Sequence, residues 1–140
     1  MPCLDANVWI YYFDETLPEH ERVRTAIRPP LESASLFTTT VLQMEVIHYL
    51  ERQLESDANA IERFLSLSDT VVAELSTDDI YRATDYLDRL SGTGVGGRDA
   101  TVLAAMERYD VSELWTHDTG LKRAGGRIEW LSVTDPVAET

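Results

Sequence analysis

The sequence is poor in cysteine and lysine and has no long apolar run. Its one cysteine, Cys3, has no second cysteine to pair with, which excludes an internal disulfide and a cysteine-based zinc site. No run approaches the roughly 20 apolar residues that a membrane-spanning helix needs, and the basic-then-apolar pattern of a leader is missing. We therefore expect a cytoplasmic protein with no membrane partner and a buried, inert Cys3 thiol.

Positive charge is also scarce. Aspartate and glutamate number 25 against 12 lysines and arginines, the formal net charge is −13, and Lys122 is the only lysine. Acids crowd polar stretches such as DETLPEHE (14–21), which indicates a solvated acidic surface resembling that of proteins from salt-rich, halophile-like cytosols. An acidic face for a basic partner gives the same charge count, so both interpretations stay open.

Length and composition are those of one folded domain. The chain has 140 residues, of which 44% are hydrophobic and 26% charged, close to the average for globular proteins. No repeat or linker divides it, so residues 1–140 are predicted to form a single domain.

Short strand-like runs alternate with helical patterns, which favours an α/β protein: a three-layer α/β/α fold with a mostly parallel central sheet. Strands are expected at 2–5, 36–39, 70–75, 113–116 and 128–131. Helices are expected at 7–13, 18–28, 40–54, 57–67, 77–90, 98–109 and 118–124.

Helix ends and faces follow from local patterns. The pair Pro29-Pro30 is expected to stop the second helix. Thr40-x-x-Gln43 offers a capping box, and Ser76 or Thr77 a cap for the helix after it. The residues expected to face the core from 57–67 and 77–90 are Ile61, Phe64, Leu65, Leu67, Ile80, Ala83, Leu87 and Leu90.

Four acids stand where strands end or helices begin. Asp5 ends the first strand, Glu45 lies in the second turn of a helix beside an apolar stripe, Asp99 opens a helix, and Asp118 follows the strand ELWT. Each alone has a structural explanation as a cap, a dipole partner or a surface residue. Converging in one crevice, they would repel one another unless a cation neutralised them, and oxygen-only ligands favour Mg²⁺ or Mn²⁺.

The order and context of these acids resemble the PIN-domain family. The matching stretches are LDANVWI, TTTVLQMEVIHYL, GRDATVLAAMERY and LWTHDTGLK. The resemblance extends over almost the whole chain, whose size is similar to that of VapC-type toxins from toxin–antitoxin pairs. Gly96-Gly97-Arg98 and Leu121 depart from the family pattern, which bears on substrate fit rather than on the metal site.

The resemblance implies a PIN-like fold and a ribonuclease that depends on Mg²⁺ or Mn²⁺. Metal-activated water would cleave RNA, and the protein would be a homodimeric toxin silenced by an antitoxin. Carried over by motif, the catalytic and metal-holding residues are Asp5, Glu45, Asp99 and Asp118, and those that support the ligands or position the substrate are Asn7 and Thr116.

Other functions remain open. A housekeeping RNA-processing nuclease would carry the same residues, and a non-catalytic PIN-like module would use the acids structurally or for a basic partner. A receiver-like phosphoryl-transfer domain fits less well, because Asp5 has no acidic neighbour and Lys122 comes too late in the chain.

Several residues near the acids have simpler explanations than catalysis. The segment SGTGVGG (91–97) is not followed by the G-K-[ST] of a phosphate-binding loop, so a flexible rim to the crevice is favoured. His117 is interpreted as structural. The aromatic run Trp9–Phe13 is expected in the core or at a dimer surface rather than stacked on bases.

An acidic chain that binds RNA needs local cations, because phosphate contacts usually supply most of the affinity. The predicted ones are Arg98, beside Asp99, and the basic stretch formed by Lys122, Arg123 and Arg127. Alternatively, Lys122 and Arg123 only complement the C-terminal end of their helix.

The basic stretch gives a first prediction. Replacing Lys122 and Arg123 together by Ala should weaken RNA binding without affecting metal binding, because two phosphate contacts are removed far from the ligands. RNA affinity can be followed by fluorescence anisotropy and metal affinity by calorimetry. Unchanged RNA affinity would favour the helix-end explanation.

Overall fold

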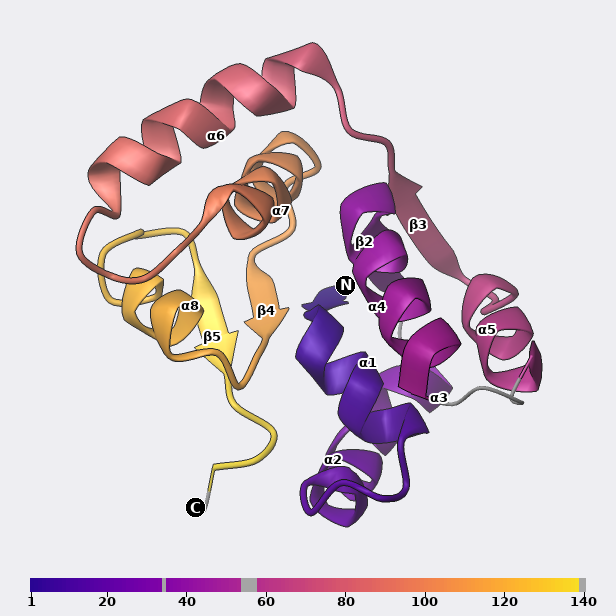
Figure 1. The fold of residues 1–140 in the computed structure, drawn as a ribbon. Coiled ribbons are helices and arrows are strands. Elements are labelled where there is room, and N and C mark those ends of the chain that lie inside the picture. The colour runs from indigo at the N-terminus through magenta and orange to yellow at the C-terminus, as the bar shows by residue number, and fades with distance from the viewer. Residues whose placement is uncertain (34, 54–57, 139–140) are drawn as a thin grey trace.

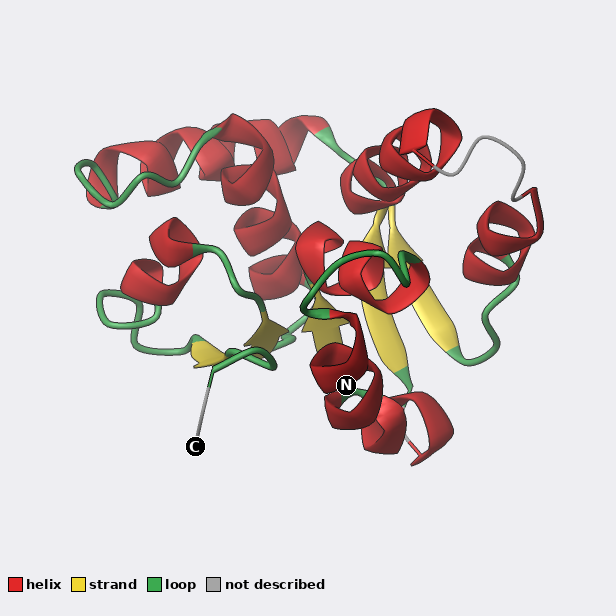
Figure 2. Ribbon diagram, turned by 60° about the horizontal axis from the view of Figure 1, so that its bottom comes forward, coloured by secondary structure: helices red, strands yellow, loops and turns green. Residues whose placement is uncertain are grey.

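The computed structural model describes residues 1–33, 35–53 and 58–138 (Figure 1). Within this part of the chain, five parallel strands form one sheet in the order β3-β2-β1-β4-β5. Helices lie on both of its faces (Figure 2), which confirms the predicted three-layer α/β arrangement. The strands are β1 (Pro2–Leu4), β2 (Leu36–Thr39), β3 (Thr70–Ala73), β4 (Glu113–Trp115) and β5 (Ser132–Thr134).

The helices fall close to the predicted segments. The described ones are α1 (Ala6–Phe13), α2 (His20–Ala26), α3 (Arg28–Ser33), α4 (Thr40–Gln53), α5 (Ala58–Leu65), α6 (Thr77–Arg89), α7 (Gly97–Arg108) and α8 (Thr119–Ala124). The expected end of α4 at Leu54 and start of α5 at Asp57 lie outside the described residues. No helix in the described ranges is long and apolar enough to cross a membrane.

The strand order places a switch point between β1 and β4. From β1 the chain winds outward through β2 to β3, and then returns to β4 and continues to β5 on the opposite side. Leu4 of β1 pairs in register with Trp115 of β4, so the two strands end side by side. In open α/β sheets this is where ligands bind, since the crossovers diverge and leave a crevice.

The core surrounds the central strand. All three residues of β1 are buried, and Cys3 is fully enclosed, as predicted. Burial and the nearby Asp5 carboxylate both raise the pKa of the Cys3 thiol, so the thiol stays protonated and inert.

The aromatic run Trp9–Phe13 belongs to this core, which was one of the two locations expected from the sequence, the other being a dimer surface. Trp9 and Phe13 are buried and contact Phe64 of α5, with the Trp9 and Phe64 ring centroids 5.2 Å apart. Tyr11 and Tyr12 are half-buried and pack against the same cluster.

The pair Pro29-Pro30 does not end the helical structure. Helix α2 already ends at Ala26, and both prolines lie in the first turn of α3. Proline is tolerated there because the first-turn N–H groups have no partner inside the helix. The sequence-based prediction overlooked this second role of the two prolines.

The predicted capping box of α4 is also wrong. The side chain that accepts the Leu42 N–H, at 3.1 Å, is that of Thr39, the last residue of β2. The hydroxyl of Thr40 instead accepts the N–H of Leu75 at 3.3 Å and so fastens the chain beyond β3 to α4. At α6 the expected Ser76 cap is confirmed, with Asp79 completing the capping box.

The prediction of the last strand at 128–131 is wrong, because the strand lies further along the chain. Residues 128–131 form a turn that buries Ile128 and Leu131, and the strand follows as β5. Two apolar side chains packed on a core from a turn give the same short pattern as a strand, so periodicity alone cannot separate them.

The buried face of α6 differs from the predicted one. Ile80 and Leu87 are 47% and 39% exposed, and Leu65 of α5 is 49% exposed, whereas Tyr86 is buried with the expected Ala83 and Leu90. The buried stripe of α6 begins at Asp79, only 1% exposed. Because this buried stripe contains a charged residue, a search for apolar residues at helical spacing does not find it.

Asp79 is neutralised by Arg108 of α7. The guanidinium donates to both carboxylate oxygens at 2.9 Å through Nε and a terminal nitrogen, and Ser76 N–H donates at 3.1 Å. Burial disfavours the charged form, but these hydrogen bonds outweigh it and lower the pKa of Asp79. The pair thereby ties the start of α6 to the end of α7.

This pair yields a stability prediction. Asp79→Asn should lower the free energy of unfolding by about 1–3 kcal/mol at pH 7, because Arg108 loses its bidentate partner. The folded-state pKa lies below that of the unfolded chain, so the contribution is complete above pH ~4 and shrinks as the pH falls through the lowered pKa. Urea unfolding at several pH values measures both effects.

The neighbouring, exposed Asp78 provides the matched control. Asp78→Asn should change the unfolding free energy little at any pH. Equal effects of the two substitutions would contradict the assigned role of the Asp79–Arg108 pair.

Candidate active site

The four acids singled out by sequence line one cavity at the carboxyl edge of the sheet. Its volume is about 450 Å³. Four separate segments supply them: the end of β1, the second turn of α4, the first turn of α7 and the start of α8. The lining residues are Asp5, Ala6, Asn7, Ile10, Glu45, Gly94, Gly96, Gly97, Arg98, Asp99 and Asp118.

Asp5 is the most constrained of the four. It is 5% exposed and caps α1, with Oδ1 accepting the Ala6 N–H at 2.8 Å and Oδ2 accepting the Thr116 hydroxyl at 2.7 Å. Burial raises the pKa of Asp5, the two hydrogen bonds work against that rise, and the charge of Asp118 adds to it. A fixed carboxylate of this kind points its remaining lone pairs in set directions.

Thr116 links two of the acids. While it donates to Asp5, its hydroxyl oxygen accepts the backbone N–H of Asp118 at 3.0 Å. Asn7 connects the same two segments, because its Oδ1 accepts the His117 N–H at 3.4 Å. Both predicted supporting residues therefore bridge the ends of β1 and β4.

Asp99 carries the clearest electrostatic signal. Burial, and then the charges of Asp5, Asp118 and Glu45, raise its pKa to about 7, with Arg98 acting in the opposite direction. The pKa of Glu45 is raised in the same way, by burial first and by Asp5, against Arg98. Strongly perturbed carboxyl groups gathered in a crevice are typical of functional sites.

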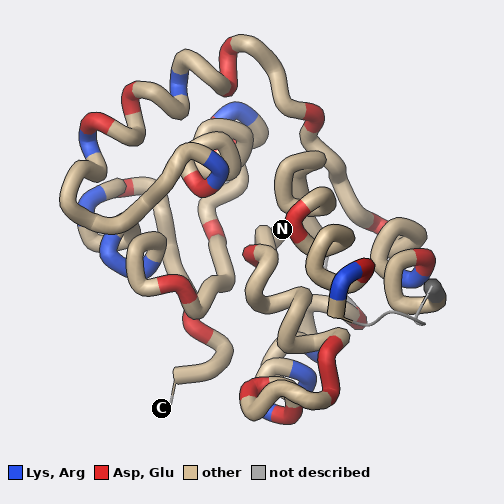
Figure 3. Tube along the Cα trace, viewed as in Figure 1, with Lys and Arg blue, Asp and Glu red and all other residues tan. Residues whose placement is uncertain are grey.

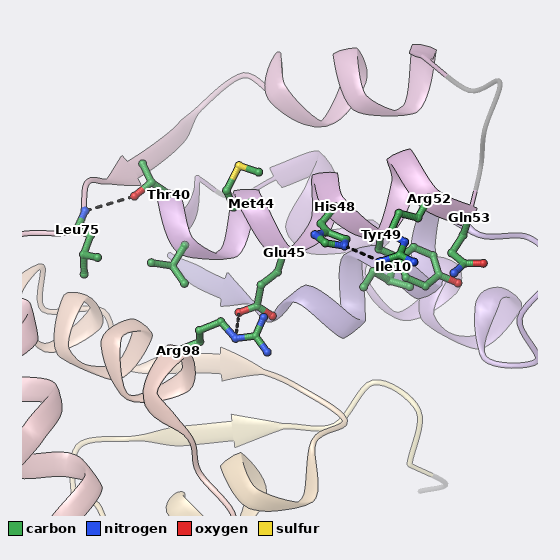
Figure 4. A pocket seen from close by; sticks show the side chains of 11 residues that line it. Ile10, Thr40, Met44, Glu45, His48, Tyr49, Arg52, Gln53, Leu75 and Arg98 are labelled. Carbon is green, nitrogen blue, oxygen red and sulfur yellow. Dashed lines mark hydrogen bonds and ion pairs between the residues drawn. The ribbon is translucent and has the colours of Figure 1, made fainter.

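Arg98 stands at the rim of the cavity. Its side chain is 76% exposed, and its Nε lies 3.9 Å from Oε1 of Glu45 (Figure 4). At that distance and exposure the ion pair is weak, so the guanidinium remains accessible to another anion.

The donor set fits a hard divalent cation. Among the described residues, no three His, Cys, Asp or Glu side chains are already gathered closely around one point. Holding one cation would therefore require the carboxylates to lie closer together than they do here. Their oxygens are the ligands that Mg²⁺ and Mn²⁺ prefer, and Cys3 is buried under Asp5 with its thiol protonated.

Comparison with known proteins identifies the family of the chain. The family described as PIN domain matches residues 3–127. The chain belongs to the PIN-domain family. No curated protein sequence matches it.

Solved structures share the fold of this PIN domain at low identity. VapC20 from Mycobacterium tuberculosis, described as a Sarcin-Ricin loop cleaving toxin, aligns with a TM-score of 0.73 and 17% identity over 89% of this chain and 95% of its own. FitAcB from Neisseria gonorrhoeae gives 0.71 and 17% over 97% and 98%. VapBC2 from Rickettsia felis, bound to a promoter DNA fragment, gives 0.70 and 14% over 96% and 97%.

The glycine-rich segment of this PIN domain lies at the rim of the cavity, as predicted, and the flexibility expected of it stays a prediction. Gly92 and Gly94 have φ values of 83° and 95°, which L side chains rarely adopt. The loop is also fastened: Arg123 donates to Thr93 O at 3.5 Å, and Arg127 to Ser91 O at 3.0 Å.

Sequence reasoning missed Gly120. A Cβ atom there would lie 3.0 Å from the carbonyl carbon of Gly94 and 3.1 Å from Oδ2 of Asp118. Glycine at 120 therefore lets α8 approach the rim loop while Asp118 caps α8 by accepting the Leu121 N–H at 2.9 Å. The local sequence D-T-G, a small residue just after an acid, was the available signal.

The predicted RNA-binding residues separate into two groups. Arg98 lines the cavity, whereas Lys122, Arg123 and Arg127 are not among its lining residues. The basic positions of α8 and the following turn lie beside β5, and acids are spread over most elements (Figure 3). Arg123 and Arg127 hold the rim loop, and Lys122 donates to Asp135 at 2.6 Å.

His117 has the structural role favoured by sequence. Its Nδ1 lies 3.0 Å from both carboxylate oxygens of Asp135. Burial disfavours the charged form of Asp135, yet hydrogen bonds from Lys122 and His117 lower its pKa to about 2. The cluster anchors the segment after β5 near the site.

The raised pKa of Asp99 predicts an unusual pH dependence. Its folded-state pKa of about 7 lies above the usual value near 4, so metal-free protein should lose stability as the pH rises from about 4 to 7. Asp99→Asn should remove that loss and stabilise the fold at pH 8 by about 2 kcal/mol, allowing for solvent screening in an open cavity. Unfolding in EDTA at pH 5 and pH 8 measures the difference.

Asp88→Asn, an exposed position on α6, is the control and should show no such pH-dependent gain. If Asp99→Asn is equally stable relative to wild type at both pH values, the proposed repulsion in the cavity is absent.

Proposed function

We propose that this PIN domain is an endoribonuclease of the VapC toxin type that uses Mg²⁺ or Mn²⁺. The observation that carries the proposal is the cavity lined by Asp5, Glu45, Asp99 and Asp118, four carboxylates brought from distant parts of the chain to the switch point of the sheet. A purely structural role for the acids would not require them to converge at the cost of a pKa near 7 in Asp99.

The four carboxylates would hold the cation. When bound, Mg²⁺ or Mn²⁺ lowers the pKa of a water molecule and offsets charge on the phosphate under attack. Asp5 is preorganised for this role by Thr116 and by the start of α1, and the other carboxylates would have to move toward it. Glu45 is the most adjustable ligand, because its present partner Arg98 lies at 3.9 Å.

The chain's other residues would position RNA. Arg98 offers a positive charge at the mouth of the cavity, where a phosphate would approach. Gly94, Gly96 and Gly97 present no side chains at the rim, so a sugar–phosphate backbone can come close to Asp99. Thr116 and Asn7 keep the ends of β1 and β4 in register during this approach.

An antitoxin partner and a homodimer in the cytoplasm complete the proposal. One solved structure with this fold is described as a toxin–antitoxin complex from Klebsiella pneumoniae, with a TM-score of 0.69 and 18% identity. A small reading frame beside the gene, encoding a DNA-binding protein that blocks cleavage, would favour the toxin over a housekeeping RNA-processing nuclease.

The decisive test removes one carboxylate at a time. Asp5→Asn and Asp99→Asn should each abolish metal-dependent cleavage of cellular RNA, because each removes a charged oxygen ligand. Asp88→Asn should cleave like wild type. Sequencing the products made with Mg²⁺, Mn²⁺ or EDTA would also locate the cut sites.

Metal binding supplies a second readout. Calorimetric titration with Mn²⁺ should show weaker binding in both ligand variants, with circular dichroism unchanged. Wild-type cleavage and wild-type metal affinity in both would refute the assignment and leave a non-catalytic binding module.

A further inference from the structure

A groove leaves the carboxylate cavity along α4. It encloses about 800 Å³ and shares Ile10, Glu45 and Arg98 with the cavity. Figure 4 shows Glu45, His48 and Arg52 following one another along α4, away from the contact between Glu45 and Arg98. From Glu45 to Arg52 the helix advances about 10 Å. The groove is thus a continuation of the candidate active site.

The groove is basic although the chain is acidic. Among the described residues that line it, Glu45 is the only acid, against Arg52, Arg98 and His48. Among the described residues, the guanidinium of Arg52 has Nε2 of His48 as its hydrogen-bond partner, at 3.5 Å, and not a carboxylate. Most of the free surface has the opposite sign, so this local reversal selects for an anionic ligand.

Three arginines outside the groove are engaged by acids. Arg24 pairs with Glu21, Arg82 with Glu107 and Arg108 with Asp79, in each case through a carboxylate. Guanidinium groups without a carboxylate at bonding distance are more readily available for phosphate. Among the described residues Arg52 meets that condition, and Arg98 keeps only its weak 3.9 Å ion pair with Glu45 in the same groove.

The groove wall is apolar near the start of α4, on the side of Glu45 that faces away from Arg52 (Figure 4). Met44 is 61% exposed and Leu75 is 46% exposed, and both line it. Thr40 holds Leu75 in place by accepting its backbone N–H. A strand in the groove would meet cations along one part and apolar side chains at the other, which suits an anionic backbone that carries flat, partly apolar bases.

We propose that the α4 groove binds a single strand of RNA, with phosphates at Arg98 and Arg52 and bases against Met44 and Leu75. This inference rests on the proposed ribonuclease function and deepens it, since the strand would run from the cleavage site along α4. Arg52 is then a substrate-positioning residue outside the basic stretch that the sequence singled out. A basic antitoxin segment would meet like charges at both arginines.

The experiment measures RNA affinity without cleavage. With a labelled single-stranded RNA decamer in EDTA, Arg52→Gln should raise Kd roughly 5–10-fold near 0.1 M salt and reduce the salt slope by about 1. Arg52→Lys should restore most of the affinity, because the charge returns. Arg89→Gln, which removes an arginine stacked on Tyr86 of α6, is the matched control and should bind like wild type.

Kinetics separate positioning from chemistry. In the metal-loaded enzyme, Arg52→Gln should raise KM by more than it lowers kcat. RNA affinity equal to wild type in Arg52→Gln would overturn the proposal and leave the groove to a protein partner, even if RNA is cleaved. Conversely, if Arg52→Gln weakens RNA binding but the wild-type protein cleaves no RNA, the groove proposal is supported and the proposed nuclease is refuted.

Discussion

The structure depends on how one buried carboxylate is held. Asp5 follows the central strand, where no water can solvate it fully, and it is stabilised by one backbone N–H and one threonine hydroxyl. Those two contacts come from the chain segments on either side of the switch point. The ends of β1 and β4 therefore cannot slide or spread without leaving a charge unpartnered in the core, which costs several kcal/mol.

Like charges then accumulate around this fixed point. Asp99, Asp118 and Glu45 come from three other segments, and burial first and then the neighbouring carboxylates raise the pKa values of Asp99 and Glu45. Stability and function oppose each other here. Elsewhere Asp79 is paired with Arg108 and Asp135 with Lys122, whereas the cavity acids share only the weak contact of Glu45 with Arg98.

Sequence alone predicted the α/β class, the alternation of elements and the convergence of four acids, because parallel strands bring their carboxyl ends to one edge. The sequence-based prediction was wrong where neighbouring residues could make the same contact, or where a contact joins residues distant in sequence. Thr39 rather than Thr40 caps α4, and the charged Asp79 belongs to a buried stripe, since its partner Arg108 is distant in sequence. The α4 groove was likewise invisible, because its basic character appears only when Arg52 and Arg98 are placed together.

The contact between Gly94 and Gly120 has a consequence for the width of the site. Main chain meets main chain there, so the loop that precedes Asp99 packs closely on the helix that follows Asp118 because position 120 carries no side chain. A side chain at position 120 would therefore push apart the two segments that carry Asp99 and Asp118.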